Sequence, residues 1–503
     1  MKLVTTGTEP ALRQPNQSWR MASALTQLLA LLPQAFILPS SRFGNHLRGA
    51  CFRDCGTHGK CTRGLCNCTS GWSGLDCSTS STRERDAEPM DGFLYIFTPP
   101  TQFLSRLAQI GHGDPVFAAE HLFTQRALGD KKLRTLDPRR AKLFFVPIFL
   151  YHNLGNQVLK KSGYYHSSLV KILRDVDPLF NHTWSRNTSS HVFFFVNDKG
   201  ACAVDRGPIF VTYWGLTVPY KFMVVPNRWK LTFGKSRLAG FGLGLEKESS
   251  VPCADENDII VPPVRTATYN SSFPDLLFLD SSHTASECTL FFAGPVAKGG
   301  SVCPSSCTAE VDPEVPCAKA ERMCCLGKPP MDPRVANASR CYGQDVRGEL
   351  FAHHENRTGF CITRRLPPKD VPRMVAHARF CLAPSGEGFG CRLPEYMIRG
   401  GCIPIIIQPS VIQPFADVLP YHQFSLRFRF EDIPNLHTLL AAITPERYAA
   451  LKRGLHRYAE AFDWLTHRGL AYEYTRYSLC LRAGGPCKHL KPGAPRRAQD
   501  ANL

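Results

Sequence analysis

The stretch of residues 379–408 reads RFCLAPSGEGFGCRLPEYMIRGGCIPIIIQ and contains a complete strand, turn, helix and strand pattern. Short apolar runs at 380–382 and 403–407 predict two buried strands. Between them, a glycine-rich turn at 386–390 leads into a helix. We expect this helix to begin near residues 392–394, because proline is tolerated in a first helical turn, and to end at a glycine pair. Such a unit is typical of a parallel sheet covered by helices.

The turn and the start of this helix also indicate a binding site for an anion. Free backbone N–H groups at the first turn of a helix bind phosphate, and the planar guanidinium of Arg392 suits a diphosphate. Glu395, one turn into the helix, can accept hydrogen bonds from ribose hydroxyls. The alternative is that Glu395 only complements the helix dipole and that the glycines make an ordinary turn. The stretch by itself leaves both interpretations open.

The composition supports a secreted or luminal protein with an anionic ligand. The 503 residues give room for roughly three domains, and 60 Lys and Arg against 42 Asp and Glu leave a net charge of +18. A positive electrostatic field of this kind attracts anions such as nucleotide phosphates, acidic polysaccharide and anionic lipid. The 21 cysteines favour an oxidising compartment and argue against a nucleic-acid partner. Seven N-glycosylation sequons agree with this, at Asn16, Asn67, Asn181, Asn187, Asn270, Asn337 and Asn356.

The amino-terminal region carries an apolar segment at residues 22–38. It is short and interrupted for a spanning helix, which needs about 20 apolar residues. Lys2, Arg13 and Arg20 precede it, which favours a cytoplasmic amino terminus. A cleaved signal peptide beginning at Met21 is the alternative. We expect residues 1–50 to form a cytoplasmic tail, a signal anchor and a stem.

Six cysteines crowd into residues 51–77, which end CNCTSGWSGLDC. A segment of this length cannot bury a core of its own, so we expect disulfide bonds to hold it together. The polar residues 78–90 then form a linker.

The remaining chain alternates apolar runs with helical patterns. Buried strands are predicted at 92–98, 142–149, 192–196, 209–212, 258–261, 289–293, 379–382 and 403–407, with a helix at 116–128. Continuous apolar runs separated by helices predict an α/β protein with parallel sheets. One sheet seldom fills so long a region, so we expect two Rossmann-like domains, at 91–250 and 251–480, with ligands at the carboxyl ends of the strands. The second holds a cysteine-rich insertion at 303–341, and a basic tail follows at 481–503.

Several motifs together resemble the exostosin family, glycosyltransferase family 47. They are, in chain order, RTLDPRRAKLFFVP (134–147), HVFFFVNDKGAC (191–202), DIIVPP (258–263), LFFAG (290–294), FCLAPSGEGFGCRLPEYMIRGGCIPIII (380–407) and PFADVL (414–419). The last of these, PFADVL, corresponds to a strand in the family pattern. The likeness runs from about residue 91 to residue 463, and ordered motifs at this density are far more specific than any single one.

This resemblance implies a GT-B fold, in which two Rossmann-like domains bind an acceptor in the first and a nucleotide-sugar in the second. It implies an inverting glycosyltransferase of the Golgi, a single-pass type II membrane protein with a luminal catalytic region, that uses a nucleotide-sugar, usually a UDP-sugar, as co-substrate. By the same resemblance, Arg392 and Arg347 hold the diphosphate and Glu395 the ribose. Ser385 and Gly386 line the phosphate loop, and Gly401 shapes the floor of the pocket. Inversion needs a general base, and Asp198 is the candidate.

The chain departs from the family pattern at several positions. Asn197 stands where a histidine is expected and Lys199 where an aromatic residue is expected, which puts the role of Asp198 in doubt. Tyr396 replaces the alanine that usually follows the glutamate.

Residues 51–77 resemble an epidermal-growth-factor-like module. The resemblance implies three disulfides, Cys51–Cys61, Cys55–Cys66 and Cys68–Cys77. No acidic pair precedes Cys51, so we expect no calcium. Such a module acts either in recognition or as a spacer on a stem, and the second use is more common.

A metal site is not expected elsewhere in the chain either. Asp175 and Asp177 form a D-x-D pattern, which holds a cation in other transferases, but at a helix end two solvated carboxylates are the simpler interpretation. We therefore expect no metal and no cofactor.

Two other functional classes compete with the transferase. An extracellular or catalytically silent protein that binds glycans through the disulfide module is one. A polysaccharide hydrolase is the other, but the sequence shows no convincing pair of carboxylates for it. The expected partners are a nucleotide-sugar, a glycan acceptor and a membrane, and homo- or hetero-oligomers stay open.

Overall fold

The computed structural model describes the chain in segments between residues 51 and 492. The described residues are 51–62, 64–80, 90–104, 115–150, 159–197, 200–202, 204–217, 252–264, 288–294, 346–367, 369–385, 392–399, 401–466 and 468–492. The expected anchor at 22–38, the insertion at 303–341 and Asp198 lie outside them. Among the described residues, no helix is both long and apolar enough to cross a membrane.

The first domain is built on a five-stranded parallel sheet with the spatial order β10-β8-β7-β6-β5. Its strands are β5 (Leu94–Ile96), β6 (Leu143–Phe145), β7 (His191–Phe195), β8 (Ile209–Thr212) and β10 (Ile259–Ile260). Successive side chains of these strands enter two different cores, as Phe144 and Phe145 do. The strands are therefore buried on both faces, which explains their continuous apolar sequences.

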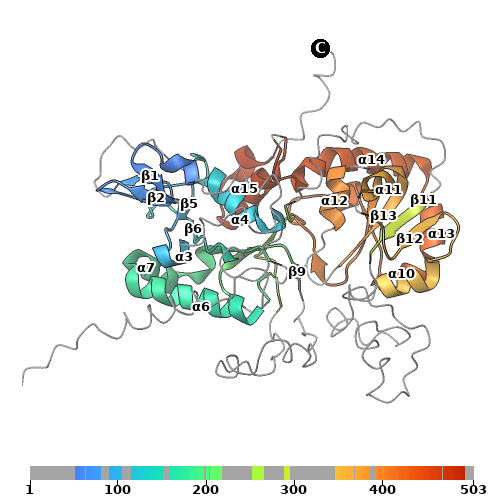
Figure 1. Ribbon diagram of the computed structural model, residues 1–503, viewed down its shortest axis with the longest axis horizontal. Helices are drawn as coiled ribbons and strands as arrows, with labels where there is room; N and C mark the ends of the chain where they lie inside the picture. The colour runs from blue at the N-terminus through green and yellow to red at the C-terminus, as the bar shows by residue number, and fades with distance from the viewer. Residues whose placement is uncertain are drawn as a thin grey trace, which may run out of the picture.

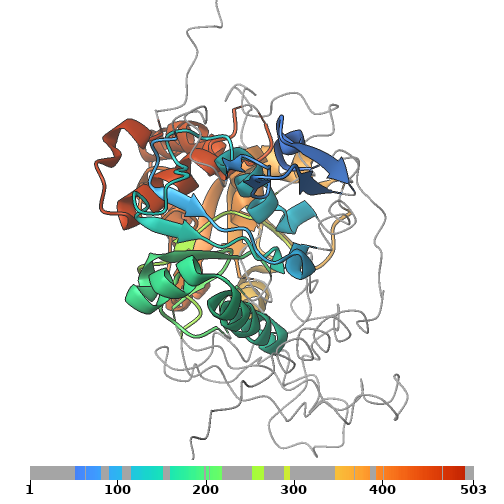
Figure 2. The ribbon, with the colours of Figure 1, turned by 90° about the vertical axis from the view of Figure 1, so that its left-hand side faces the viewer.

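Helices cover both faces of this sheet (Figures 1 and 2). On one face lie α6 (Leu159–Val176) and α7 (Pro178–Arg186), and on the other lies α4 (Ala119–Ala127). Asp177 caps α7, because its Oδ1 accepts hydrogen bonds from the backbone N–H groups of Leu179 and Phe180 at 2.9 and 3.0 Å. The short α3 (Thr101–Leu104) follows β5.

The second domain also has a five-stranded parallel sheet, with the order β12-β11-β13-β14-β16. Its strands are β11 (Cys288–Ala293), β12 (Phe360–Thr363), β13 (Ala378–Pro384), β14 (Ile403–Ile407) and β16 (Leu426–Arg427). Its helices are α10 (Val346–His354), α11 (Val371–His377), α12 (Arg392–Arg399), α13 (Leu436–Ala441) and α14 (Pro445–Tyr458). From β11 the chain goes outward to β12 and then returns to β13 on the other side of β11. The order in which the chain adds strands across the sheet therefore reverses between β11 and β13, while the strands themselves stay parallel.

The carboxyl ends of the two sheets meet at a small antiparallel pair of strands. β9 (Gly215–Leu216) follows β8, β15 (Val411–Ile412) follows β14, and the two pair with each other. Close by, the backbone N–H of Phe415 donates to the carbonyl oxygen of Ile260 at 2.8 Å. Figure 1 shows β9 between the two halves of the molecule. Both carboxyl edges, where ligands of such sheets bind, therefore face this junction.

The structure corrects three of the expected boundaries. β10 pairs with β8, so the first domain extends past residue 250 because a strand after that point completes its sheet. β4 (Thr79–Ser80) pairs with β3 (Trp72–Ser73), which extends the disulfide module into the expected linker. Part of the expected tail at 481–503 is folded, since α15 (Ala471–Arg482) continues into it and a disulfide joins Cys480 to Cys487.

The segment at 414–419 is a turn and not the expected strand. Leu419 and Val418 donate from their backbone N–H groups to the carbonyl oxygen of Phe415, at 2.8 and 3.0 Å. Phe415 itself has a φ of 54°, which no extended strand adopts.

Helix α15 returns from the second domain to pack on the first (Figure 1). The Tyr472 hydroxyl and the Arg476 guanidinium both donate to Asp130 Oδ2, at 2.9 and 2.8 Å. The Tyr472 ring lies 5.5 Å from that of Phe123 in α4. The two domains are thus joined by a crossing helix as well as by β9 and β15.

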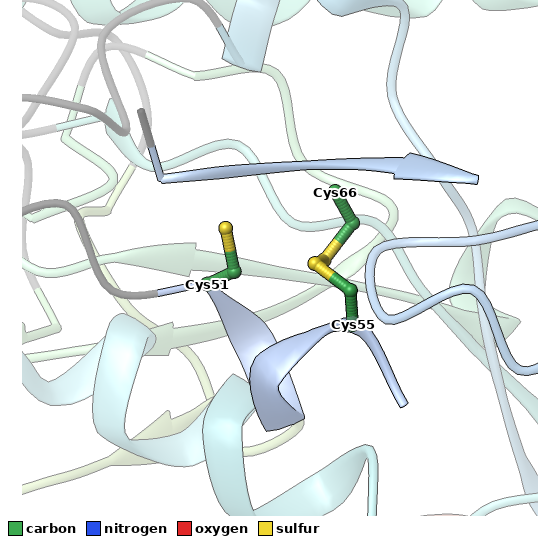
Figure 3. Close-up of side chains that lie close together, drawn as sticks. All are labelled: Cys51, Cys55 and Cys66. Atoms are coloured by element: carbon green, nitrogen blue, oxygen red, sulfur yellow. A yellow bond between two sulfur atoms is a disulfide. The ribbon is translucent and has the colours of Figure 1, made fainter. Parts of the chain in front are cut away.

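The disulfide module has the three pairs that the resemblance implies, Cys51–Cys61, Cys55–Cys66 and Cys68–Cys77. It contains β1 (Gly59–Thr62) paired with β2 (Leu65–Cys68), and a short helix, η1 (Phe52–Cys55). The sulfurs of Cys51, Cys55 and Cys66 lie within 4.8 Å of one another (Figure 3). Each belongs to a disulfide, so none is a thiolate that could bind a metal.

Further disulfides link segments within each of the two large domains. They join Cys202 to Cys253, Cys288 to Cys361, and Cys381 to Cys402.

Candidate active site

The reversal point between β11 and β13 brings together most of the predicted site residues that the structure describes. In open parallel sheets a ligand binds in the crevice at the carboxyl ends of the strands where the strand order reverses. β11 ends at Ala293 and β13 ends at Pro384, and these ends lie side by side because the two strands pair. Three of the predicted residues, Ser385, Arg392 and Arg347, contact these two strand ends.

Arg392 begins α12, as the sequence predicts. Its Nη2 atom donates to the carbonyl oxygen of Ala293 at 2.7 Å, and its Nη1 atom lies 3.4 Å from Glu395 Oε2. The side chains of Arg392 and Glu395 are 26% and 15% exposed, so both remain accessible to a ligand. The guanidinium is therefore held at the end of β11 although it belongs to the helix after β13.

Arg347 approaches the same place from α10. Its Nε atom donates to the carbonyl oxygen of Ser385 at 3.2 Å, and its guanidinium lies 5.5 Å from the centre of the Phe292 ring. The side chain is buried, as is Ser385. A buried guanidinium is held at a fixed position and is screened little by water, so its positive field acts strongly on a neighbouring anion.

Gly294 directly follows β11, next to the two arginines. A Cβ atom at this position would lie 3.5 Å from Arg347 Nη1 and 3.0 Å from the ring of Phe292. The glycine keeps space open beside the guanidinium. The LFFAG motif contains Ala293 and Gly294, but no local pattern assigns either of them to the site, because their role depends on an arginine about 100 residues away in the chain.

The structure does not bring Gly401 to this group. Gly401 lies beyond the carboxyl end of α12, a helix of 8 residues and so about 12 Å long at 1.5 Å per residue, whereas Arg392 begins it. A Cβ atom there would lie 2.1 Å from the carbonyl oxygen of Val375, so the glycine allows α11 and α12 to pack closely. Lys452 Nζ donates to the Gly401 carbonyl oxygen at 2.6 Å, and burial lowers the pKa of this lysine to about 8.

Two other predicted site residues lie outside the described residues. Gly386 belongs to the segment 386–391, and Asp198 follows Asn197. Asn197 is buried and is the second residue after the carboxyl end of β7. The catalytic role of Asp198 and the phosphate role of Gly386 therefore stay predictions.

Two cavities among the described residues lie elsewhere. One of about 680 Å³ lies between α6 and α7 and includes Asp175, Trp184 and Arg206. The other, of about 910 Å³, lies near the amino ends of β11 and β12 and includes Thr289, His354 and Arg379. Asp177 of the D-x-D pattern caps α7, as described above, and Asp175 is exposed at the end of α6. The pattern thus lies away from the two arginines.

The arrangement at the reversal point can bind and neutralise a diphosphate. Two guanidinium groups come from different helices, and the first turn of α12 adds backbone N–H groups with a positive dipole. The carboxylate of Glu395 stands one helical turn from Arg392 and can accept hydrogen bonds from hydroxyl groups. A nucleoside diphosphate with a sugar leaving from it fits this chemistry.

Comparison with known proteins supports the same chemistry. The exostosin GT47 domain matches residues 334–443, which include Arg347, Ser385, Arg392 and Glu395. The chain is 24% identical over 411 residues to "Probable beta-1,4-xylosyltransferase IRX10L" of Arabidopsis thaliana, covering 76% of this chain and 81% of that protein. It is 24% identical over 356 residues to a "Probable glucuronoxylan glucuronosyltransferase" of the same plant, covering 67% of this chain and 62% of that protein.

Another relative matches a shorter part of the chain at higher sequence identity. The chain is 33% identical over 121 residues to a "Probable glycosyltransferase" of Arabidopsis thaliana, which covers 24% of this chain and 23% of that relative. The family domain, the long matches to named transferases and the residues at the reversal point agree with one another. The exostosin GT47 domain matched at residues 334–443 and the long similarity to proteins named as transferases identify the chain as a glycosyltransferase.

Proposed function

We propose that the protein is an inverting glycosyltransferase with a GT-B arrangement that transfers a sugar from a UDP-sugar to a glycan acceptor in the Golgi lumen. The observation that carries the donor site is the convergence of Arg347 and Arg392 on the adjacent ends of β13 and β11. In this proposal the two guanidinium groups hold the diphosphate, and they stabilise the charge that develops on it as the sugar leaves.

Glu395 is assigned to the ribose. Its carboxylate lies beside Arg392, so the diphosphate and the ribose bind side by side on α12. Inversion at the sugar carbon needs one base that takes the proton of the acceptor hydroxyl. Asp198 is proposed for this step, since in the sequence it comes shortly after β7, whose carboxyl end belongs to the edge of the first sheet that faces the junction.

The remaining parts of the proposal concern the rest of the chain. The disulfide module is proposed to be EGF-like, and its disulfide pairing and its two small hairpins support this. The segment 22–38 anchors the protein in the membrane as a single-pass type II protein, with the disulfides and sequons in the oxidising lumen. The reaction proceeds without a metal, because the two arginines and the helix terminus supply the positive charge that a cation supplies in other transferases.

The names of the relatives suggest the first substrates to test. We propose UDP-xylose and UDP-glucuronic acid as donors and xylotetraose, a β-1,4-linked xylo-oligosaccharide, as acceptor. Purified protein is incubated with each donor and acceptor, and the masses of the products are measured by mass spectrometry. The expected result is a mass gain of one pentose or one hexuronic acid residue. A panel of other UDP-sugars and glycan acceptors extends the screen. Absence of transfer with every pair, together with no binding of UDP by calorimetry, would reject the proposed function.

A further inference from the structure

The disulfide module is docked on the first domain through buried side chains. Phe52 and Leu75 of the module are 3% and 6% exposed and belong to the same core as the inner strands of the first sheet. Figure 1 shows the module against the end of the first domain at which β5 lies. A spacer that only extends a stem would need no such burial, because its contacts with the catalytic region could be few and polar.

A buried ion pair fixes the orientation of the module. Arg134 Nη1 donates to Asp76 Oδ2 at 3.2 Å and to the carbonyl oxygen of Leu128 at 2.9 Å. The side chains of Arg134 and Asp76 are 3% and 1% exposed. Arg53 Nη1 adds contacts to the same two acceptors, at 3.3 Å each. A buried charge network of this kind tolerates little displacement, since loss of one partner leaves the other charged and without compensation.

Phe52 connects this rigid module to one particular turn. Its ring stacks on that of Phe149, with centres 5.8 Å apart and planes inclined by 26°, and it lies 4.9 Å from the ring of His121. Phe149 has a φ of 44°, a backbone conformation that a bulky side chain adopts only under strain. Such strain persists only where the surroundings hold the residue in place.

Glu120 holds the same turn through its backbone. Its Oε1 atom accepts hydrogen bonds from the backbone N–H groups of Ile148 and Phe149, at 2.7 and 2.8 Å. Glu120 lies in α4, and the carboxyl end of α4 supplies Leu128, which the module contacts. The strained turn is thus held both by α4 and by Phe52.

The position of this turn places it at the edge of the first sheet where a ligand would bind. It follows β6 and so lies on the carboxyl edge of the first sheet, the edge that faces the junction with the second domain. We propose that the disulfide module is a positioning element of the acceptor site: Phe52 fixes the backbone of residues 146–150, which shape the acceptor side of the junction. This inference rests on the proposed function in placing the acceptor at the first domain.

The first test measures the turn directly, without turnover. Hydrogen exchange followed by mass spectrometry compares the full chain with Phe52→Ala and with the control Trp72→Ala. Trp72 is also an aromatic residue of the module, but its ring stacks on His58, within the module, 3.5 Å between centres. Phe52→Ala should speed exchange in the peptide that contains residues 146–150 by about tenfold, because the local opening becomes easier. Trp72→Ala should leave that peptide unchanged, and both variants should leave the peptides of β13 and α12 unchanged.

The second test separates positioning from general loss of stability. With xylotetraose, or the acceptor that the screen identifies, Phe52→Ala should raise KM for the acceptor about tenfold while the Kd for UDP stays within about twofold of the wild type. Phe52→Leu, which keeps apolar volume but loses the stacked ring, replaces Phe52→Ala in both tests if the alanine variant does not fold.

Two results would overturn the proposal. One is unchanged exchange at 146–150 in a folded Phe52 variant. The other is an equal loss of acceptor and UDP binding. If the wild-type protein neither binds UDP nor transfers a sugar, the proposed function fails, and the exchange experiment still decides whether the module holds the turn.

Discussion

Arg392 donates a hydrogen bond to the carbonyl oxygen of Ala293 at 2.7 Å, and this contact joins the helix after β13 to the end of β11. It spans the point at which the strand order reverses. The guanidinium is therefore held where a ligand of the second sheet would bind, before any ligand arrives. Preorganisation of this kind lowers the cost of binding, because the side chain has already lost its rotational freedom.

The first prediction concerns the diphosphate. Arg392→Ala should weaken UDP binding roughly tenfold, about 1.4 kcal/mol, and should weaken UMP binding much less, because UMP lacks the second phosphate. Calorimetry with both nucleotides measures the difference. Arg373→Ala is the matched control, since Arg373 is an exposed cation on α11 in the same domain. Wild-type UDP affinity in the Arg392 variant would place the donor elsewhere.

Glu395 should behave differently, because a ribose contact is common to both nucleotides. Glu395→Ala should weaken UDP and UMP binding alike, by roughly 1.5–3 kcal/mol, the usual range for a hydrogen bond to a charged group. The fold should survive, since the partly exposed pair of Glu395 and Arg392 contributes less than about 1 kcal/mol to stability. The melting temperature checks this, and Glu395→Gln should recover part of the affinity. Loss of UDP binding alone would instead assign Glu395 to the orientation of Arg392.

Metal dependence gives a third prediction. Transfer should continue in excess chelator, because Arg347, Arg392 and the first turn of α12 neutralise the diphosphate. Asp177→Ala should destabilise the protein by about 1 kcal/mol through loss of the helix cap, but it should leave the rate of transfer unchanged. Activity that disappears with chelator and returns with manganese, and that also needs Asp177, would revive the D-x-D pattern as a metal site.

The sequence predicted the inner strands of both sheets well, and a physical reason explains this. Strands buried on both faces, such as HVFFF in β7 and IPIII in β14, are continuous apolar runs that stand out from their surroundings. The sequence did not predict β12 or the two-residue β16, which lie at the edges of the second sheet and are short or partly exposed. These two strands are not buried along their whole length, so they cannot be recognised in this way.

The candidate site was predicted only in part, for a related reason. Arg392 and Glu395 could be found because they share one turn of a helix that follows a glycine-rich segment. The contact of Arg392 with Ala293 and that of Arg347 with Ser385 depend on the order of the strands, which no local pattern encodes. The docking of α15 on Asp130, over about 340 residues of chain, is equally invisible in the sequence. The docking of the disulfide module on Phe149 is another contact of this kind.

The last prediction uses the buried carboxyl of Glu120 as a probe of the turn at Phe149. Burial raises the pKa of Glu120 from 4.5 to about 8. The hydrogen bonds that its carboxyl accepts from backbone N–H groups lower the pKa, but by less. In the unfolded chain the carboxyl ionises near 4.5, so the folded protein binds more protons between these values. The contribution of Glu120 to stability is therefore fully present below about pH 4.5, and it decreases as the pH rises toward about 8, by up to about 1.4 kcal/mol for each pH unit.

Glu120→Gln keeps an oxygen that can accept from Ile148 and Phe149 but cannot ionise. The fall in Tm between about pH 5 and about pH 7.5 should therefore be smaller in this variant than in the wild type. Glu446→Gln serves as the control, because Glu446 is exposed and hydrogen bonds to the backbone and to Thr444 lower its pKa, so that it titrates below this window. An identical fall in Tm for the wild type and Glu120→Gln would show that the carboxyl is ionised in the folded protein. The turn at Phe149 would then be held by a charged group, and the strain there would be opposed by stronger hydrogen bonds than a neutral carboxyl provides.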